Sequence, residues 1–178
     1  MILPTRYKEV KQSDIPKKIQ EFIKTIHTHK KGLYIHGSVG SGKTHLMYAI
    51  GKMVEDLKIV DRVWIFNSTD LLRQIREDFN PSDKYENKHL FQKLLEFRGL
   101  LMIDDIGSEK LSDWVLETFY LIINKRYEEV LPTIFTSNLM IKDLAEKIGD
   151  RSTSRIIESC DILQISGDDR RIKKYKKI

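Results

Sequence analysis

The sequence predicts an α/β fold in which a parallel β-sheet lies between layers of helices, and three observations support this. Short apolar runs rich in β-branched and aromatic residues alternate along the chain with longer stretches of helical periodicity. The first apolar run, residues 32–36, leads through a glycine-rich loop directly into a helical stretch. The chain has 178 residues, 40% of them hydrophobic and 32% charged, which suits one domain with a buried core. We therefore expect a single sheet covered on both faces.

The region before the first strand predicts one helix over residues 15–28. Its apolar positions recur at spacings of three and four, Ser13 and Asp14 provide a cap, and Pro16 lies in the first turn. The residues after the glycine-rich loop, 45–50, also have helical character. The chain therefore begins with a helix, a strand, a loop and a second helix.

The alternation continues to the end of the chain. Further strands are expected at residues 62–66, 99–103, 132–136 and 161–165, and further helices at 71–79, 84–97, 111–130, 141–148 and 150–158. Asn80 and Pro81 separate the first two of these helices. The organisation is an N-terminal extension with its helix at 1–31, a core at 32–165 and a basic tail at 166–178.

Charge and cysteine content limit the kinds of partner and compartment. The net charge of +5 permits a polyanionic partner, either a nucleotide or a nucleic acid, without demonstrating one. The single cysteine, Cys160, lies in the apolar run 156–165, so we expect a buried thiol rather than a disulfide or a zinc ligand. No apolar run approaches the roughly 20 residues of a membrane span, and the N-terminus lacks a signal-peptide pattern. We expect a cytoplasmic protein without a membrane partner.

The segment from Gly37 to Thr44 has the sequence of a phosphate-binding loop, G-S-V-G-S-G-K-T. It lies between a strand and a helix, so successive backbone N–H groups can converge on phosphate oxygens near a helix N-terminus. Lys43 is expected to reach the β- and γ-phosphates, and the Thr44 hydroxyl to bind Mg²⁺. The other nucleotide contacts are assigned to Gly37, Gly40, Ser41 and Gly42. The alternative is a glycine-rich turn that binds nothing.

Two adjacent acids, Asp104 and Asp105, end another apolar strand. Asp104 is expected to bind Mg²⁺ through the metal's water shell, because the residue that ends the strand points toward the ion at Thr44. Asp105 would then be the general base for a water in line with the γ-phosphate. An ordinary boundary between strand and turn is the alternative.

Small polar residues, Thr136, Ser137 and Asn138, close a further strand. The Asn138 amide could accept a hydrogen bond from the attacking water and donate one to a γ-phosphate oxygen. Asn138 is also a common turn residue and needs no function for that reason.

Two arginines, Arg151 and Arg155, are four residues apart on a predicted helix and share one face. Both could be plain surface charges. Guanidinium groups presented to the γ-phosphate of a neighbouring subunit would instead make hydrolysis depend on assembly.

Four motifs in this order resemble the DnaC/DnaI family of bacterial replicative helicase loaders, which belongs to the AAA+ ATPases and is close to the DnaA initiators and the IstB transposition helpers. They are G-S-V-G-S-G-K-T-H-L, L-L-M-I-D-D-I-G, T-S-N and G-D-R-x-x-S-R-I, and the resemblance covers about residues 15–172. It implies a five-stranded AAA+ core that binds ATP or ADP with Mg²⁺.

The resemblance also implies roles for individual residues. It implies Lys43 and Thr44 as Walker A with His45 beside them, Asp104 and Asp105 as Walker B, Asn138 as sensor 1, Arg155 as the arginine finger with Arg151 as its neighbour, and Arg170 as the sensor 2 arginine.

Three features differ from the wider AAA+ pattern. Asp105 is one methylene shorter than the glutamate that many AAA+ proteins carry there, so we expect slow, switch-like turnover. Only 13 residues follow Ile165, which leaves no room for a full C-terminal helical lid. The resemblance implies an N-terminal helicase-binding domain, whereas about 30 residues precede the first strand here. We expect a fragment, or a loader without that module.

The resemblance implies that residues 70–97 form a helical insertion that contacts single-stranded DNA in an oligomer. The segment contains cations and an aromatic residue suited to phosphate contact and base stacking, namely Lys84, Tyr85, Lys88 and Lys93. It also contains acids, so an amphipathic helix pair with salt-bridged charges is an equal alternative. The basic tail could bind DNA or be solvated.

The leading hypothesis is an ATP-dependent loader of the hexameric replicative helicase, with ATP sites shared between subunits of an oligomer on single-stranded DNA. An IstB-like transposition helper or a DnaA-like initiator are related alternatives. A small P-loop metabolite kinase and a nucleotide-gated binding module without catalysis come from other classes.

Overall fold

Five strands form one parallel sheet in the computed structural model, which describes residues 3–78 and 90–167. The strands are β1 (Gly32–His36), β2 (Val63–Asn67), β3 (Leu100–Asp104), β4 (Thr133–Ser137) and β5 (Cys160–Gln164). Their order in the sheet is β2-β3-β4-β1-β5, and every neighbouring pair is parallel. The predicted five-stranded parallel sheet is confirmed, and each strand lies within one residue of its expected position.

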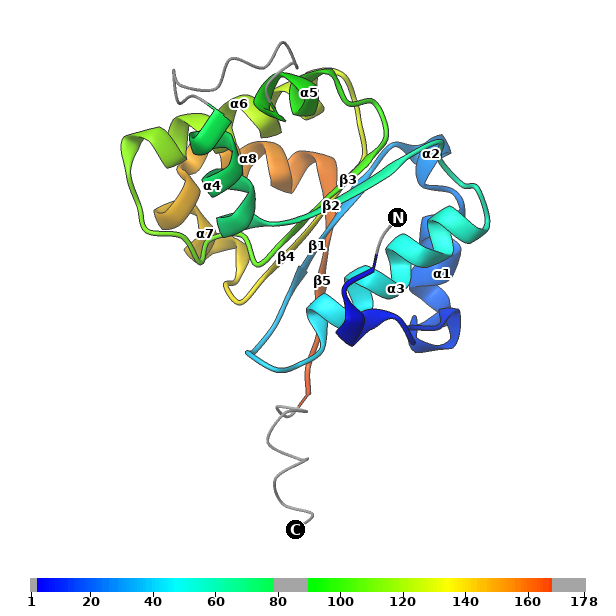
Figure 1. The fold of residues 1–178 in the computed structure, drawn as a ribbon. Coiled ribbons are helices and arrows are strands. Elements are labelled where there is room, and N and C mark those ends of the chain that lie inside the picture. Colours follow the sequence, from blue (N-terminus) through cyan, green and yellow to red (C-terminus); the bar gives the residue numbers. More distant parts are fainter. Residues whose placement is uncertain (1–2, 79–89, 168–178) are drawn as a thin grey trace.

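Helices cover both faces of this sheet (Figure 1). They are η1 (Thr5–Tyr7), η2 (Gln12–Asp14), α1 (Lys17–Lys24), α2 (Ile26–His29), α3 (Lys43–Asp56), α4 (Ser68–Asp78), α5 (Leu90–Glu96), α6 (Asp113–Glu128), α7 (Ile141–Ile148) and α8 (Asp150–Ser159). Figure 1 shows α1 and α3 on one side of the sheet and α4 to α8 on the other.

The single helix predicted over residues 15–28 is wrong. The chain instead forms η2, α1 and α2, with Pro16 as the residue before α1. Thr25 separates the two α-helices with φ −109° and ψ 11°. Its hydroxyl donates to the carbonyls of Glu21 and Phe22, and such side-chain bonds to the preceding turn compete with helix continuation. The apolar spacing was sound, but it could not show this break.

The core consists of two apolar layers, one on each face of the sheet. Along β3, Leu101 and Ile103 pack in the layer beneath α4 to α8, whereas Leu100 and Met102 pack in the layer beneath α1 and α3. All four side chains are fully buried. This two-sided burial explains why the strand is apolar at every position.

Strands β1 and β4 approach each other closely at their amino ends. A Cβ atom on Gly32 would lie 1.9 Å from the carbonyl oxygen of Thr133, so only glycine fits there. The two strands then run in register from Leu33 opposite Ile134 to His36 opposite Ser137. Their carboxyl ends therefore lie side by side.

A buried cation connects the amino ends of the strands. Arg126, on α6, is 3% exposed and donates to the carbonyls of Phe97, Gly99 and Pro132 and to the Thr133 hydroxyl. Burial lowers the pKa of its guanidinium to about 9. The predicted burial of Cys160 is confirmed, and burial raises the pKa of that thiol to about 12.

Several predicted features fall outside the described residues. Lys84, Tyr85 and Lys88 lie there, and so does Arg170 with most of the predicted tail. Of the helix predicted at 84–97, the described part is α5, where Lys93 is exposed. None of the helices within residues 3–78 and 90–167 has the length and apolar character needed to cross a membrane.

Candidate functional site

A cavity of about 570 Å³ opens at the carboxyl ends of the strands. Its lining comes from η1, the glycine-rich loop, α3 and the ends of β2, β3 and β4, and comprises Arg6, Tyr7, Val39, Gly40, Gly42, Lys43, Thr44, His45, Asn67, Asp104, Asp105, Thr136 and Asn138. Ligands of open α/β sheets bind at this edge. The volume is within the usual range for small-molecule sites.

The glycine-rich loop forms one wall of the cavity. Gly40 and Gly42 have φ of 77° and 101°, a region that side chains disfavour, and Gly42 precedes the first residue of α3. The Ser41 side chain is 2% exposed, and its hydroxyl has no hydrogen-bond partner among the described residues. An orphaned hydroxyl beside a helix N-terminus suits a phosphate oxygen. The loop therefore fits the phosphate-binding role predicted for it.

The side chain of Lys43 folds back over this loop. It is 7% exposed, and its Nζ donates to the carbonyls of Gly37 and Ser38 at 2.8 and 2.9 Å and to Oδ1 of Asn138 at 2.7 Å. The ammonium group is thus held at the cavity wall by oxygen acceptors. A phosphate could take the place of these acceptors, because an ammonium group can turn its three donors to new partners.

The end of β3 faces the first turn of α3. Thr44 Oγ1 lies 3.2 and 3.0 Å from the two carboxylate oxygens of Asp104, and the Thr136 hydroxyl donates to Oδ1 of Asp104 at 2.5 Å. A hydroxyl and a carboxylate facing each other are the oxygen ligands that Mg²⁺ accepts in nucleotide sites. Thr44 and Asp104 could therefore hold the ion, as predicted.

Asp105 has a left-handed backbone conformation, which most residues with a side chain avoid. Its φ is 61°, in the left-handed region that aspartate enters more readily than most residues. Three contacts fix it: its N–H donates to the Thr136 hydroxyl at 2.9 Å, its carbonyl accepts from Ser68, and its carboxylate accepts from the Asn138 amide at 2.7 Å. These contacts hold Asp105 in the cavity lining.

The Asn138 amide joins the two walls of the cavity. Its oxygen accepts from Lys43, and its nitrogen donates to Asp105. The structure therefore brings together the lysine, the amide and the second aspartate that the sequence separates by up to 95 positions. The predicted contact of this amide with the attacking water stays a prediction.

The N-terminal segment contributes residues that the sequence did not point to. Tyr7 stacks on Tyr48 of α3 with ring centroids 4.5 Å apart, and Arg6 beside it lines the cavity. Asp14 accepts from Nε2 of His45 at 3.0 Å, and its pKa is lowered by the Lys11 backbone N–H and then by His45. No periodicity signals these contacts, because they join segments more than 30 residues apart.

Two further residues near the cavity were assigned no role from the sequence. Thr136 bonds to both aspartates, although it reads as the last residue of an apolar strand. Glu109 accepts from the backbone N–H of Gly107, and burial raises the pKa of its carboxyl. A hydroxyl residue directly before two small polar residues could have singled out Thr136, whereas nothing local marks Glu109.

The two predicted arginines lie elsewhere. Arg151 and Arg155 are on α8, and neither is among the described residues that line the cavity. Arg151 is exposed, and Arg155 packs against α6. Within one chain, the structure therefore does not bring these side chains to the loop at Gly40.

Comparison with known proteins agrees with this architecture. The model of the family described as IstB-like ATP binding protein matches residues 6–178. The chain belongs to this family. Its fold is that of an AAA+ domain, since the five-stranded sheet and its helices match the DnaC, DnaI and DnaA structures.

Individual relatives of this IstB-like chain come from bacterial replication. It is 28% identical over 129 residues to the replicative helicase loader DnaI of Bacillus subtilis strain 168, covering 71% of the chain and 40% of the relative. It is 31% identical over 114 residues to the chromosomal replication initiator DnaA of Geobacter sulfurreducens, covering 63% of the chain and 24% of the relative. The chain thus spans less than half of either relative.

Solved structures resemble the IstB-like chain over most of its length. A DnaC helicase loader has a TM-score of 0.77 and 27% identity, covering 92% of this chain and 100% of that one. A DnaI structure has a TM-score of 0.75 and 27% identity, and the match covers 96% of this chain and 95% of the DnaI chain. AMPPCP-bound DnaA from Aquifex aeolicus has a TM-score of 0.75 at 22% identity, and the match covers 99% of this chain and 56% of the DnaA chain. At this identity the comparison shows a shared fold and nothing more.

Proposed function

We propose that the chain is a Mg²⁺-dependent ATPase that acts as a loader of a hexameric replicative helicase on single-stranded DNA. The hydrogen-bonded series from Lys43 through Asn138 to Asp105, in one cavity with Thr44 and Asp104, supports the ATPase part. The family's ATP-binding description also supports the ATPase part. The likeness to DnaI and DnaC supports the loader part. ATP binding would assemble an oligomer, and hydrolysis would release it.

The proposed reaction is attack of water on the γ-phosphorus. Asp105 takes a proton from the water as its oxygen bonds to phosphorus, the bond to the β–γ bridging oxygen breaks, and ADP and phosphate leave. Lys43 neutralises charge on the β- and γ-phosphates, and Asn138 orients Asp105. Thr44 and Asp104 would hold Mg²⁺, which supplies further charge neutralisation on the phosphates. Arg155 would act on the γ-phosphate bound to a neighbouring copy.

Two variants test the ATPase. Lys43→Ala is expected to lose nucleotide affinity, whereas Asp105→Asn is expected to keep it and to lose phosphate release by about 100-fold, the scale of a lost general base. Fluorescent-nucleotide titration and phosphate release measure the two quantities. The exposed Asp61 provides the control, since Asp61→Asn should change neither. Full turnover by Asp105→Asn would contradict the proposed base.

A second candidate function is that of an IstB-like transposition helper, and the match to the family described as IstB-like ATP binding protein favours it. That protein class acts on duplex DNA, whereas a loader needs single strands. Affinities for single-stranded and duplex DNA at one fixed salt concentration separate the two, because phosphate contacts make every such affinity salt-dependent. Preference for the duplex would reject the loader. Mass measurement with ADP and with a γ-phosphate mimic tests ATP-dependent assembly.

A further inference from the structure

Arg155 is held in place by side chains of a neighbouring helix. Its Nε donates to Oδ1 of Asn124 at 2.6 Å, and its Nη2 donates to the Tyr120 hydroxyl at 3.4 Å. The guanidinium carbon lies 5.0 Å from the ring centroid of Tyr120 and 5.7 Å from that of Tyr127, within cation–π range. A third bond runs from Nη1 to the carbonyl of Arg151 at 3.1 Å.

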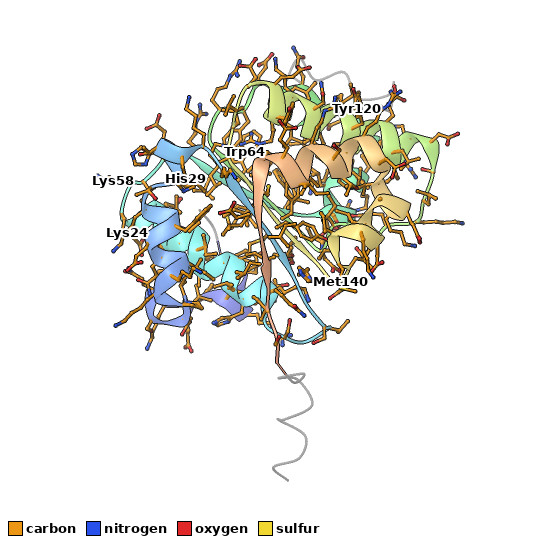
Figure 2. All side chains as sticks on the ribbon, turned by 180° about the vertical axis from the view of Figure 1, so that it is seen from behind. Lys24, His29, Lys58, Trp64, Tyr120 and Met140 are labelled. Carbon is orange, nitrogen blue, oxygen red and sulfur yellow. The ribbon has the colours of Figure 1, made fainter. Side chains whose placement is uncertain are left out.

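The three holding residues share one face of α6. Tyr120, Asn124 and Tyr127 follow one another at spacings of four and three, which places them along a single stripe of the helix. Figure 2 labels Tyr120 in the region where α6 and α8 pack together. All three side chains are half-buried, as is Arg155, so the cluster lies at the surface rather than in the core.

The Asn124 amide is itself oriented by a second contact. Its Nδ2 donates to Oε1 of Glu128 at 2.9 Å, which leaves its oxygen facing Arg155. An arginine carries about 2 kcal/mol of rotamer entropy, so fixing its side chain within the monomer removes a cost that docking would otherwise carry. Each Nη atom has two hydrogens, and the contacts described use one of each. The guanidinium keeps donors for a phosphate.

We propose that Asn124, Tyr120 and Tyr127 are positioning residues that hold Arg155 in the orientation needed to reach a γ-phosphate on a neighbouring copy of this chain. The proposal rests on the proposed function, in which Arg155 acts between subunits. It assigns to α6 the task of presenting the arginine. Misplacement of a catalytic group by about 1 Å can cost up to about 100-fold in rate, so loss of these contacts should lower turnover while nucleotide affinity is kept.

Mixed oligomers separate this role from a general effect on folding. A Lys43→Ala chain can present Arg155 but cannot bind ATP, and we call it the donor. An Arg155→Ala chain can bind ATP but presents no arginine, and we call it the recipient. Mixing the two inactive proteins with single-stranded DNA and MgATP should restore phosphate release wherever a donor adjoins a recipient. No restoration would overturn the proposed trans role of Arg155 and this proposal with it.

The second change, Asn124→Leu, is then placed in one chain at a time. In the donor it should lower the restored turnover by about tenfold with KM unchanged, because the arginine is misplaced. In the recipient, which has no arginine to position, it should change nothing. Tyr127→Leu is a second variant with the same expectation. Lys125→Ala in the donor is the control, since Lys125 pairs with Glu129 on the same helix.

The test compares the effect of each second change in the donor with its effect in the recipient. Loss of turnover confined to the donor supports positioning by α6. Restoration that both Asn124→Leu and Tyr127→Leu leave intact in the donor would overturn the proposal while leaving the trans role of Arg155 standing. Equal losses in donor and recipient for both variants would also overturn it, because the residues would then act on the fold of either chain.

Discussion

At the scale of single residues, the two aspartates depend on one hydroxyl. Thr136 donates to the carboxylate of Asp104 and accepts from the backbone N–H of Asp105. The proposed metal ligand and the proposed base are therefore set at a fixed offset by a residue that need not touch the nucleotide phosphates. Changing Thr136 therefore tests how strongly turnover depends on the relative position of the two aspartates.

Thr136→Val should uncouple the aspartates while filling nearly the same volume. We expect turnover to fall by about tenfold or more and the free energy of unfolding to fall by about 1–3 kcal/mol, since a buried N–H loses its acceptor. Steady-state kinetics and urea unfolding measure both. Thr153 is a buried threonine on α8 whose hydroxyl donates to the carbonyl of Gly149, the residue before that helix, so Thr153→Val should affect stability alone. Unchanged turnover in Thr136→Val would contradict the expectation.

Glu109 gives the stability a pH dependence of known sign. Burial raises the pKa of its carboxyl above the ordinary 4.5, so the folded chain binds this proton more tightly than the unfolded chain. The resulting stability is present at pH below 4.5 and is lost as pH rises through the raised pKa. Glu109→Gln should therefore gain stability relative to the wild type between acidic and neutral pH.

Urea unfolding at several pH values from the acidic range to neutrality checks this prediction. The exposed Glu117 is the control, because Glu117→Gln should follow the wild-type curve. Parallel curves for Glu109→Gln and the wild type would mean that the buried carboxyl does not titrate differently in the two states.

At the scale of elements, α6 performs two tasks at different points of its length. Its last turns carry Arg126, which bonds to backbone carbonyls before β3 and β4, and its outer stripe holds Arg155 of α8. The helix thus fixes the amino ends of two strands and the position of another helix. Both tasks use polar side chains that helical periodicity alone would assign to solvent.

Arg126→Leu should lower the free energy of unfolding by about 3 kcal/mol, because three carbonyls and a hydroxyl lose a buried donor. Chemical denaturation measures the change. Arg98 offers the matched arginine, since it forms an exposed ion pair with Glu129 at 2.5 Å. Arg98→Leu should cost less than about 1 kcal/mol. If both variants lost the same free energy of unfolding, the burial of Arg126 and its hydrogen bonds would add nothing to stability beyond those of an exposed arginine.

The elements were largely predictable, and their polar tertiary contacts were not. Apolar runs gave all five strands, because strands buried on both faces leave a continuous signature. The same signal failed at residues 15–28, where the backbone contacts of Thr25 end the first helix early. No local pattern marks Arg126, which resembles any other charged residue of an amphipathic helix until the fold places its carbonyl acceptors beside it.

The candidate site divides in the same way. Lys43, Asp104 and their neighbours follow strand ends, so sequence order and sheet topology together predict their proximity. Tyr7 reaches the cavity only because the N-terminal segment packs against α3, and that packing has no periodic signal. The contact between Arg155 and α6 could not be predicted from the sequence either, because it depends on how two helices are placed relative to each other.

At the scale of the whole molecule, nucleotide binding and global stability should be linked. The cavity draws its lining from five separate segments of the chain, so a ligand there contacts the folded arrangement and not the unfolded one. A ligand at about 100 times its Kd would then stabilise the fold by about 2.7 kcal/mol. Cys160 provides the readout, because it is 4% exposed and burial raises its pKa to about 12.

Labelling of Cys160 by a thiol reagent should therefore be slow and should require unfolding. MgATP at about 100 times its Kd is expected to slow it by about 100-fold. Lys43→Ala should label at the same rate with and without ATP. Rapid labelling of the native protein that ATP leaves unchanged would instead point to local opening near β5, the edge strand that begins at Cys160.

The close approach at Gly32 links the two ends of the sheet. Five residues beyond that contact, β1 has entered the loop of Lys43 and β4 has reached Asn138, and the two strands stay in register as far as His36 and Ser137. A methyl group added at Gly32 would push these strands apart at one end and tilt the other. Allele screens for defective nucleotide turnover should thus recover substitutions at a position remote from every phosphate, and sequence changes there would behave as active-site lesions.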